Sequence, residues 1–268
     1  MSHPGGPRRL WDMKIAIMGG TGTLGRQVAE ELRGREHEVR VLSRHAPEYR
    51  VDLTTGAGLD ESLTGCEVVI DASNNSSKAA AATLVEGTRR LLAASQAAGV
   101  AHHVCVSVLG CERVPAGYFR VKAEQEDAVR RGPVPWTVVR ATQFHEYVAA
   151  MMGAAARYRA IPVPRGVLQP VASAEVARVV ADVATGDAHR DEVSVAGPEQ
   201  ATIRELAQAW RRATGRRTVL VPLPLPGGLG RALRGGALTD AHPDVRGRQE
   251  FAAWAHRAQL TAQETGAR

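Results

Sequence analysis

Apolar and polar positions in the first fifty residues follow the pattern of a strand, a helix and a second strand. A near-continuous apolar run at 15–18 precedes a glycine-rich turn, and apolar residues then recur at helical spacing over 28–32. A second apolar run follows at 39–42. Continuous apolar runs are typical of parallel strands that are covered on both faces, so this segment predicts a parallel strand–helix–strand unit.

The same alternation continues as far as Arg140. Apolar runs predict strands at 67–71, 103–109 and 136–140, and helical patterns lie between them at 79–98 and 121–131. Strands that alternate with helices of this length predict an α/β fold with a Rossmann-type, doubly wound parallel sheet. Ligands bind at the carboxyl ends of the strands in such sheets, so the residues that follow each strand are candidates for a binding site.

The alternation stops after Gln143, where prolines interrupt several short apolar runs. Helical patterns remain at 174–184, 203–214 and 250–258, and an apolar run at 192–196 predicts one more strand. We expect a Rossmann domain over 13–150 and a small irregular C-terminal substrate lobe over 151–268, with 192–197 returning to the sheet. Residues 1–12 contain two prolines and two glycines, and we expect them to form a flexible leader.

The turn after the first strand has the glycine pattern of a dinucleotide site. Glycines allow positive φ in a tight turn, let backbone amides approach a pyrophosphate, and let helix and strand pack closely. The helix N-terminus that follows favours the anion. The alternative is an ordinary tight turn. The residues predicted to bind the cofactor here are Gly19, Thr21, Gly22, Thr23, Leu24 and Gly25.

The end of the second strand indicates which dinucleotide is preferred. An NAD site usually presents an acidic residue there to the ribose, whereas this strand ends in Ser43 and Arg44. A guanidinium and a hydroxyl suit a 2′-phosphate, and Arg26 offers a second cation. The alternative for Arg44 is a solvated surface residue. These residues predict NADP(H) as the cofactor.

Two further strand ends contribute candidate cofactor contacts. The Asp52 carboxylate, in the pair Asp52-Leu53, is placed to receive the adenine amino group, or else it caps a local helix as an ordinary loop residue. Ala72 and Ser73 follow the strand at 67–71, where small residues let a cofactor ribose pass close to the backbone. A plain turn is the alternative there.

Tyr118 and Lys122 are the candidate catalytic pair. Side chains four residues apart share one helix face, so the ammonium can lower the phenol's pKa and also hold the nicotinamide ribose. Such a tyrosine can exchange a proton with a carbonyl oxygen while hydride moves. Ser107 ends the preceding strand, where its hydroxyl can polarise the same carbonyl or simply bond to backbone.

The strand at 136–140 leads into Phe144 and His145, which are candidates for substrate binding. The alternative for His145 is a packed core histidine. His102 and His103 lack a third ligand, so no metal site is expected. Three cysteines have no C-x-x-C spacing, which favours free thiols in a reducing cytoplasm.

Composition bears mainly on partners. The chain has 34 Lys+Arg against 28 Asp+Glu, a net charge of +6, yet it contains only three lysines. The many arginines are interpreted as a dispersed background rather than a basic patch, so no nucleic acid partner is expected. No apolar stretch reaches the roughly 20 residues that a membrane helix needs. The expected partner is therefore a small-molecule substrate.

Several segments together resemble a known superfamily. GGTGTLGR, LSR, DAS, VSVLG, YFRVK, WTVVRATQFHEY and QPVASAEVARVV are similar to the atypical or extended short-chain dehydrogenase/reductase superfamily, and within it to the NmrA-like, isoflavone-reductase-like and complex I accessory-subunit-like proteins. The resemblance covers about 13–258. It implies that Ser107, Tyr118 and Lys122 form the catalytic set, and that the glycine turn and Arg44 bind NADP(H).

Many members of the atypical branch have lost the tyrosine–lysine pair, so its presence here favours catalysis. The Ser107-to-Tyr118 spacing of eleven is shorter than the superfamily's usual spacing, which makes Ser107 the weaker candidate. The expected activity is NADPH-dependent reduction of a small carbonyl or enone compound. Two alternatives remain: a non-catalytic NADP(H) sensor that binds a protein partner, and an epimerase or dehydratase that uses the bound nucleotide transiently.

Overall fold

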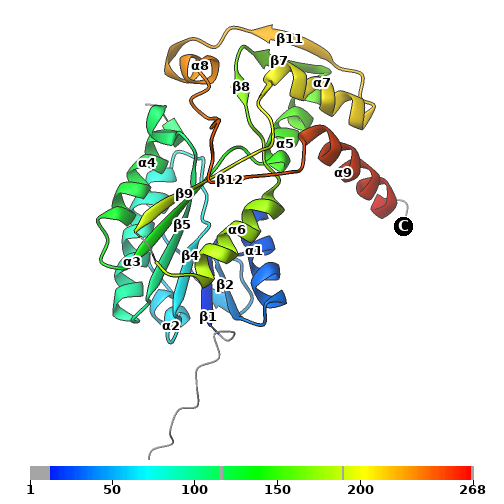
Figure 1. Ribbon diagram of the computed structural model, residues 1–268. Coiled ribbons are helices and arrows are strands. Elements are labelled where there is room, and N and C mark those ends of the chain that lie inside the picture. The colour runs from blue at the N-terminus through cyan, green and yellow to red at the C-terminus, as the bar shows by residue number, and fades with distance from the viewer. Residues whose placement is uncertain (1–12, 115–116, 189, 267–268) are drawn as a thin grey trace, which may run out of the picture. The chain divides into compact units, whose positions relative to one another are not determined.

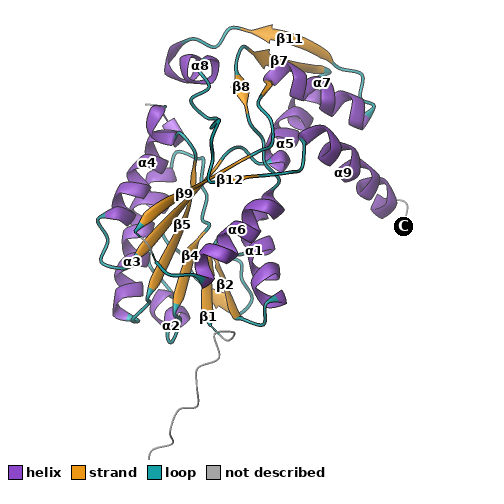
Figure 2. Cartoon of the chain, in the orientation of Figure 1, coloured by secondary structure: helices purple, strands orange, loops and turns teal. Residues whose placement is uncertain are grey.

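A computed structural model describes residues 13–114, 117–188 and 190–266; the leader expected at 1–12 lies outside these ranges. The fold is the predicted Rossmann-type α/β fold, with a sheet in the order β12-β9-β6-β5-β4-β1-β2-β3 flanked by helices (Figures 1 and 2). Its strands are β1 (Lys14–Met18), β2 (Glu38–Ser43), β3 (Tyr49–Arg50), β4 (Val68–Asp71), β5 (His102–Val108), β6 (Trp136–Ala141), β9 (Asp191–Ala196) and β12 (Val245–Arg246).

The chain divides into two compact units, at points other than the boundary expected near residue 150. The first unit comprises the described residues up to Cys105 together with Ala128–Thr137 and Val180–Asp191. The second comprises Val106–Asp127, Val138–Val179 and the described residues from Glu192 onward. The strands β5 and β6 each contribute to both units.

The first unit has a parallel core around β1. Ile15 pairs with Val39 of β2 on one side and with Val68 of β4 on the other, and its side chain is fully buried. This explains the continuous apolar run, because a central strand has no solvent-facing side. The helices of this unit are α1 (Thr23–Gly34), α2 (Leu59–Leu63) and α3 (Gly87–Ala97).

The helix expected at 79–98 is not uniform. A π-helical turn, η1 (Ala82–Glu86), precedes α3, so the regular helix begins only at Gly87. A Cβ at Gly87 would lie 2.8 Å from the Cβ of Leu53, so glycine allows the close approach of this helix to the loop before α2. Alanine-rich periodicity predicted the helical region but not the change in its winding.

The second unit has an apolar core of its own. Within it, β7 (Ala160–Pro164) and β11 (Val219–Leu223) form a parallel two-stranded sheet, and β8 (Val167–Leu168) pairs with β10 (Ala201–Thr202) (Figure 1). Trp210 and Phe251 are buried members of this core. Its helices are η2 (Cys111–Arg113), α5 (His145–Ala156), α7 (Ile203–Thr214), α8 (Gly227–Arg234) and α9 (Phe251–Gly266), together with most of α4 (Gly117–Arg130) and the first half of α6 (Ser173–Thr185), whose last residues belong to the first unit.

Two helices of the second unit were not expected. The α5 segment is apolar on nearly all sides and contains few polar residues, so it lacks the alternation that marks an amphipathic helix. The α8 segment contains three glycines, which indicate a loop, yet it buries Ala232 and Leu233 in the core of the unit. Burial stabilises the glycine-rich α8 where local sequence preference does not, whereas the alanines and methionines of α5 favour a helix.

Candidate functional site

The glycine turn between β1 and α1 has a shape that only glycine allows. Gly19 has a φ of 76°, and a Cβ there would lie 2.7 Å from the Ala72 carbonyl oxygen. A Cβ at Gly25 would lie 2.3 Å from the Gly19 carbonyl oxygen and 2.7 Å from the Gly20 Cα. The first and last glycines therefore serve the tight turn and the contact between helix and strand, as the motif predicts.

The middle of this turn is open and suits a diphosphate. Gly22 is exposed, and the nearest atom to a Cβ there would be the Gly19 carbonyl oxygen at 3.1 Å. The α1 N-terminus has no side-chain cap and no acidic residue in its first turn. Its first amides are thus available to an anion, and the helix dipole favours one. The turn fits the pyrophosphate of a nicotinamide dinucleotide.

The end of β2 lies directly beside the glycine turn. The Gly19 amide donates to the Leu42 carbonyl oxygen at 3.0 Å, which brings Ser43 and Arg44 to the same edge of the first unit. Arg44 is exposed, whereas Ser43 is buried and its hydroxyl accepts from the His45 amide at 3.1 Å. Arg44 is therefore the freer of the two to meet a ligand.

Asp52 lies near this edge, because the amide of the preceding residue, Val51, donates to the Ser43 carbonyl oxygen. Its carboxylate accepts from the Thr54 hydroxyl at 2.7 Å and from the Thr54 amide at 2.8 Å. These two bonds hold the pKa of Asp52 below its usual range, and the charge of Arg44 adds to the effect. Asp52 thus closes a local turn and does not cap the next helix, α2, whose N-cap residue is Gly58; the Leu53 side chain is buried.

The end of β4 completes this edge. Asp71 is fully buried and accepts from the Ser73 amide at 3.0 Å and from the Thr88 hydroxyl at 2.9 Å. These bonds fix the backbone of Ala72 and Ser73, which lies against Gly19. The first unit therefore brings together the predicted cofactor residues of three strand ends.

Tyr118 and Lys122 lie one turn apart on α4 in the second unit. Lys122 is only 2% exposed, and its ammonium donates to the Val106 carbonyl oxygen at 2.8 Å and to Gln125 Oε1 at 2.6 Å. Sequence analysis did not single out Gln125, whose burial and contact with the lysine become visible only in the fold. Lys122 is thus a buried, hydrogen-bonded ammonium beside a half-buried tyrosine.

The phenol of Tyr118 has a raised pKa rather than the lowered one expected from the spacing. Burial raises the pKa of Tyr118, and the positive charge of Lys122 opposes this rise without cancelling it. The predicted effect of the ammonium is therefore present, but desolvation is larger. Phe119 adds an edge-on contact, with its ring centroid 5.7 Å from that of Tyr118.

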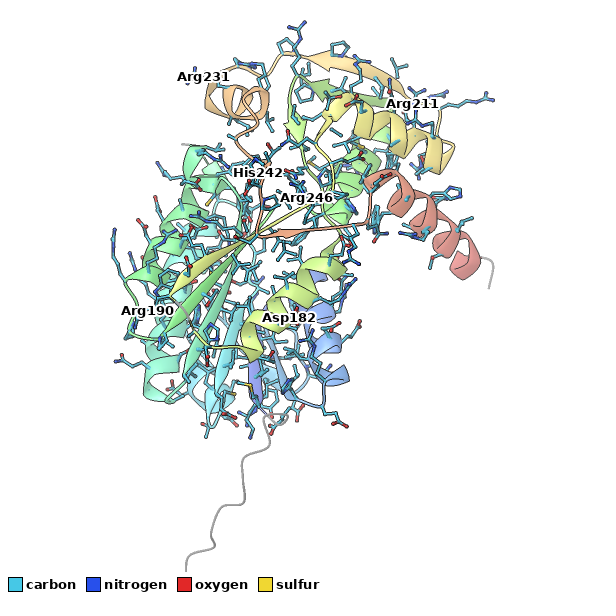
Figure 3. All side chains as sticks on the ribbon, in the orientation of Figure 1. Asp182, Arg190, Arg211, Arg231, His242 and Arg246 are labelled. Carbon is cyan, nitrogen blue, oxygen red and sulfur yellow. The ribbon has the colours of Figure 1, made fainter. Side chains whose placement is uncertain are left out.

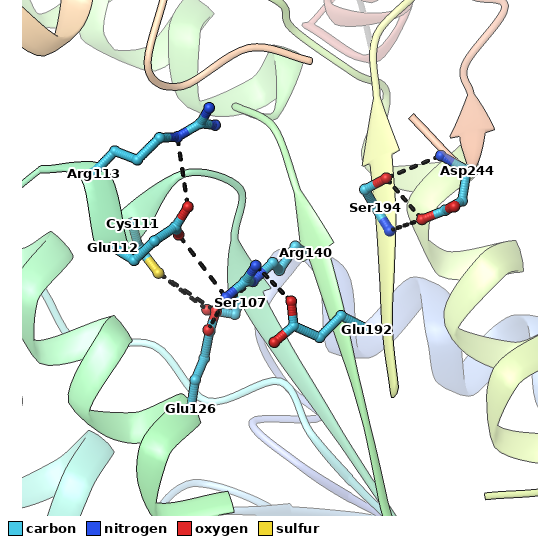
Figure 4. A network of polar contacts seen from close by, with 9 residues as sticks. All are labelled: Ser107, Cys111, Glu112, Arg113, Glu126, Arg140, Glu192, Ser194 and Asp244. Carbon is cyan, nitrogen blue, oxygen red and sulfur yellow. Dashed lines mark hydrogen bonds and ion pairs between the residues drawn. The ribbon is translucent and has the colours of Figure 1, made fainter. Parts of the chain in front are cut away.

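Ser107 belongs to a polar network at the end of β5 (Figure 4). Its hydroxyl lies 4.0 Å from the Cys111 thiol, which donates to Glu126 Oε1 at 3.4 Å. Glu126 is buried and accepts two hydrogen bonds from Arg140, at 3.1 and 2.6 Å. Burial and the Glu126 carboxylate raise the pKa of Cys111 to about 12, so the thiol keeps its proton.

His145 is packed inside the second unit. Its side chain is fully buried, its Nε2 lies 2.9 Å from the Gln249 carbonyl oxygen, and its ring contacts Phe251 and Trp254. Burial lowers the pKa of His145. This is the environment of the packed histidine given above as the alternative, whereas Phe144 is half-buried.

Among the described residues, no group of three or more His, Cys, Asp or Glu is arranged to hold a metal ion. No helix in the described ranges has the length and apolar character needed to cross a membrane.

Comparisons with known proteins agree with this geometry. A family model described as NAD(P)H-binding matches residues 19–187, which is more than half of the chain. The (4-alkanoyl-5-oxo-2,5-dihydrofuran-3-yl)methyl phosphate reductase of Streptomyces griseus subsp. griseus is 33% identical over 221 residues, covering 75% of this chain and 74% of that protein.

A second relative, Photosystem II assembly factor Ycf39 of Trieres chinensis, is 30% identical over 150 residues, covering 50% of this chain and 47% of that protein. The chain thus matches only about half the length of that factor. Among solved structures, the NADPH-dependent quinone oxidoreductase QOR2 of Escherichia coli, complexed with NADPH, has a TM-score of 0.76 at 21% identity. The match covers 91% of this chain and 99% of that one, and it shows a shared fold.

Proposed function

Because the chain belongs to the NAD(P)H-binding family, as its resemblance to NmrA-like dehydrogenases/reductases predicted, we propose that it is an NADPH-dependent reductase of a small carbonyl or enone compound. The observation that carries the proposal is the buried ammonium of Lys122, one helical turn after Tyr118. Burying a lysine is costly, so a buried lysine beside a tyrosine favours a chemical role.

The relative from Streptomyces griseus supports the enone class. Its name describes a substrate in which a ring double bond is conjugated with a lactone carbonyl and an alkanoyl group, and which also carries a phosphate. For this chain we propose a substrate of the same class, an unsaturated carbonyl compound. The glycine turn, Ser43 and Arg44 would hold the cofactor, which supplies a hydride when it is bound.

Tyr118 supplies the proton in this proposal. Hydride addition at the β-carbon of the enone moves the electron pair of the double bond toward the carbonyl oxygen, which then requires a proton. A tyrosine with its ordinary pKa of about 10 is already protonated at neutral pH, as a donor must be, and burial raises the pKa of Tyr118 further. The nearby ammonium of Lys122 stabilises the phenolate left after transfer, and solvent restores its proton.

Replacement of Tyr118 by phenylalanine tests the proposal. We expect Tyr118→Phe to lower kcat for NADPH oxidation, on a panel of enones and furanone phosphates, by roughly 10²- to 10⁴-fold, because one proton donor is removed. The affinity for NADPH should remain. The matched control is Tyr158→Phe, which removes the hydroxyl of a tyrosine that is 75% exposed. Unchanged turnover in Tyr118→Phe would exclude Tyr118 as the donor.

A non-catalytic function is the second candidate, and the similarity to the assembly factor Ycf39 favours it. The chain would then bind NAD(P)H without turnover and act through a protein partner. Tight NADPH binding, together with no cofactor oxidation by the unmodified chain on any member of the panel, would support this candidate and contradict the reductase proposal.

A further inference from the structure

A groove at the end of α7 gathers five arginines in the second unit. Its hollow measures about 790 Å³, and the residues that line it include Arg159, Arg211, Arg212, Arg216, Arg217 and Thr218. At the overall frequency of 31 arginines in 268 residues, nine lining residues would include about one. None of the described lining residues is acidic, and none belongs to the predicted cofactor or substrate residues.

The fold builds this groove from two segments far apart in sequence. The helix α7 ends at Thr214, and Gly215 turns the chain with a φ of 65° before Arg216 and Arg217. The strand β11 then begins at Val219, whose amide donates to the Arg159 carbonyl oxygen at 2.9 Å. Figure 3 labels Arg211 on the last turns of α7. Helix-dipole stabilisation accounts for Arg211 and Arg212 only, because the other three lie outside the helix.

Two buried polar side-chain atoms of the groove lack hydrogen-bond partners within the described part of the chain. None of the five arginines forms an ion pair there, and Arg216 instead lies over the Trp210 ring at 6.0 Å from its centroid. Thr218 is 6% exposed, and its hydroxyl has no hydrogen-bond partner among the described residues. The buried Nε of Arg211 likewise has none. Unpaired buried polar atoms are costly, so these two donors in the wall of the groove would be stabilised by a partner that accepts hydrogen bonds.

We propose that this groove, hereafter the arginine groove, binds a small ligand that carries two or more phosphate groups. Its volume lies in the range of small-molecule sites, roughly 300–1,000 Å³. A phosphate monoester carries a charge of about −1.5 to −2 at neutral pH, so two carry about −3 to −4 and three about −4.5 to −6, against the five positive charges of the guanidinium groups. One guanidinium group can donate two parallel hydrogen bonds to two oxygens of a phosphate. The Thr218 hydroxyl supplies a further donor.

Titration of the full chain with inorganic diphosphate and triphosphate tests the site, with inorganic phosphate as the comparison. Calorimetry gives the affinity, and Trp210 fluorescence reports the site because Arg216 covers its ring; a Trp210→Phe variant identifies that signal. We expect diphosphate to bind at least tenfold more tightly than phosphate. The triple variant Arg211→Gln, Arg216→Gln, Arg217→Gln should weaken diphosphate binding at least tenfold.

A second triple variant controls for net charge. Arg231→Gln, Arg248→Gln, Arg257→Gln removes three exposed positive charges of the same unit outside the groove, and it should leave diphosphate affinity unchanged. Thr218→Val should weaken diphosphate severalfold through loss of one hydroxyl. The affinity for NADPH at the glycine turn should be retained in the groove variants, which separates this proposal from the reductase proposal.

Three results would overturn the arginine groove as a phosphate site. If both triple variants weaken diphosphate binding equally, the binding depends on the overall positive charge of the chain and not on the groove. Equal affinities for phosphate and diphosphate would show that the groove binds single anions only. Tighter binding of an oligoglutamate peptide than of diphosphate would make the groove a contact surface for an acidic protein.

Discussion

Arg44 is the residue from which we infer a preference for NADPH. It is exposed at the edge where the glycine turn meets the end of β2, and its charge already affects the neighbouring Asp52. A guanidinium at this position can bind a 2′-phosphate through charge-assisted hydrogen bonds, each of which contributes roughly 1.5–3 kcal/mol. NADH lacks that phosphate, so the same residue should matter little for its binding.

We therefore expect Arg44→Ala to weaken NADPH binding at least tenfold and to change NADH binding little. Titration of the chain with both cofactors, followed by fluorescence or calorimetry, gives the two dissociation constants. Arg50→Ala, which removes another exposed arginine of the first unit, is the matched control. If Arg44→Ala weakens both cofactors equally, the side chain does not discriminate between them.

Residue types and spacing predict which side chains lie on the same helix better than they predict the pKa or burial of those side chains. The spacing of Tyr118 and Lys122 placed both on one helix, and the structure has them on α4. The net direction of the Tyr118 pKa was not predictable, because it depends on burial by residues distant in sequence. For the same reason, the sequence left open whether His145 is packed or lines a pocket.

The junction of β1 and α1 depends on glycine at particular positions of one element. Gly25 lies where a Cβ would overlap the backbone of Gly19 and Gly20, whereas Gly34 ends the same helix with nothing within 4 Å of a Cβ. A comparison of substitutions at Gly25 and Gly34 therefore distinguishes the steric need for glycine from the general effect of replacing glycine in a helix.

We expect Gly25→Ala to destabilise the chain by roughly 1–3 kcal/mol and to weaken NADPH binding strongly, because α1 must move away from the turn. Gly34→Ala should leave both properties unchanged or raise stability slightly. Urea unfolding and NADPH titration of the two variants measure these effects. A Gly25→Ala variant that binds NADPH normally would contradict the proposed packing of the turn.

At the scale of elements, the hydrophobic pattern predicted the helices that are amphipathic and the strands that are continuously apolar. The helix predicted at 203–214 coincides with α7, which begins with a capping box between Thr202 and Glu205. Two of the helices it missed, α5 and α8, are nearly uniform in polarity or rich in glycine. The helical state of α8 follows from burial within the second unit, which local sequence does not encode, whereas α5 consists largely of residues that favour a helix.

At the scale of the whole chain, the positive charge is less evenly distributed than its composition suggested. The segment RRATGRR at 211–217 was a signal in the sequence for a local cluster, and it was interpreted as part of a dispersed arginine background. Arg159 joins that cluster only because β7 and β11 pair in parallel. Such pairing between distant segments cannot be derived from the charge of the chain.

The stability of the chain should also depend on a buried histidine of the first unit. His103 on β5 is fully buried, and neither ring nitrogen has a hydrogen-bond partner among the described residues. Burial lowers the pKa of His103 to about 4, although the negative charge of Asp71 opposes this shift. Its pKa in the unfolded chain is about 6.5, so between these values the unfolded state binds more protons than the folded state.

This histidine therefore contributes stability that is fully present above about pH 6.5 and is lost as the pH falls toward 4. We expect the free energy of unfolding to be lower at pH 5 than at pH 7, with His103 accounting for on the order of 1–2 kcal/mol of the difference. Urea unfolding at both pH values measures it. His103→Gln should reduce the difference, whereas His256→Gln, at an exposed position, should not. If the pH dependence is the same in both variants, protonation of His103 does not limit stability, and other groups must account for it.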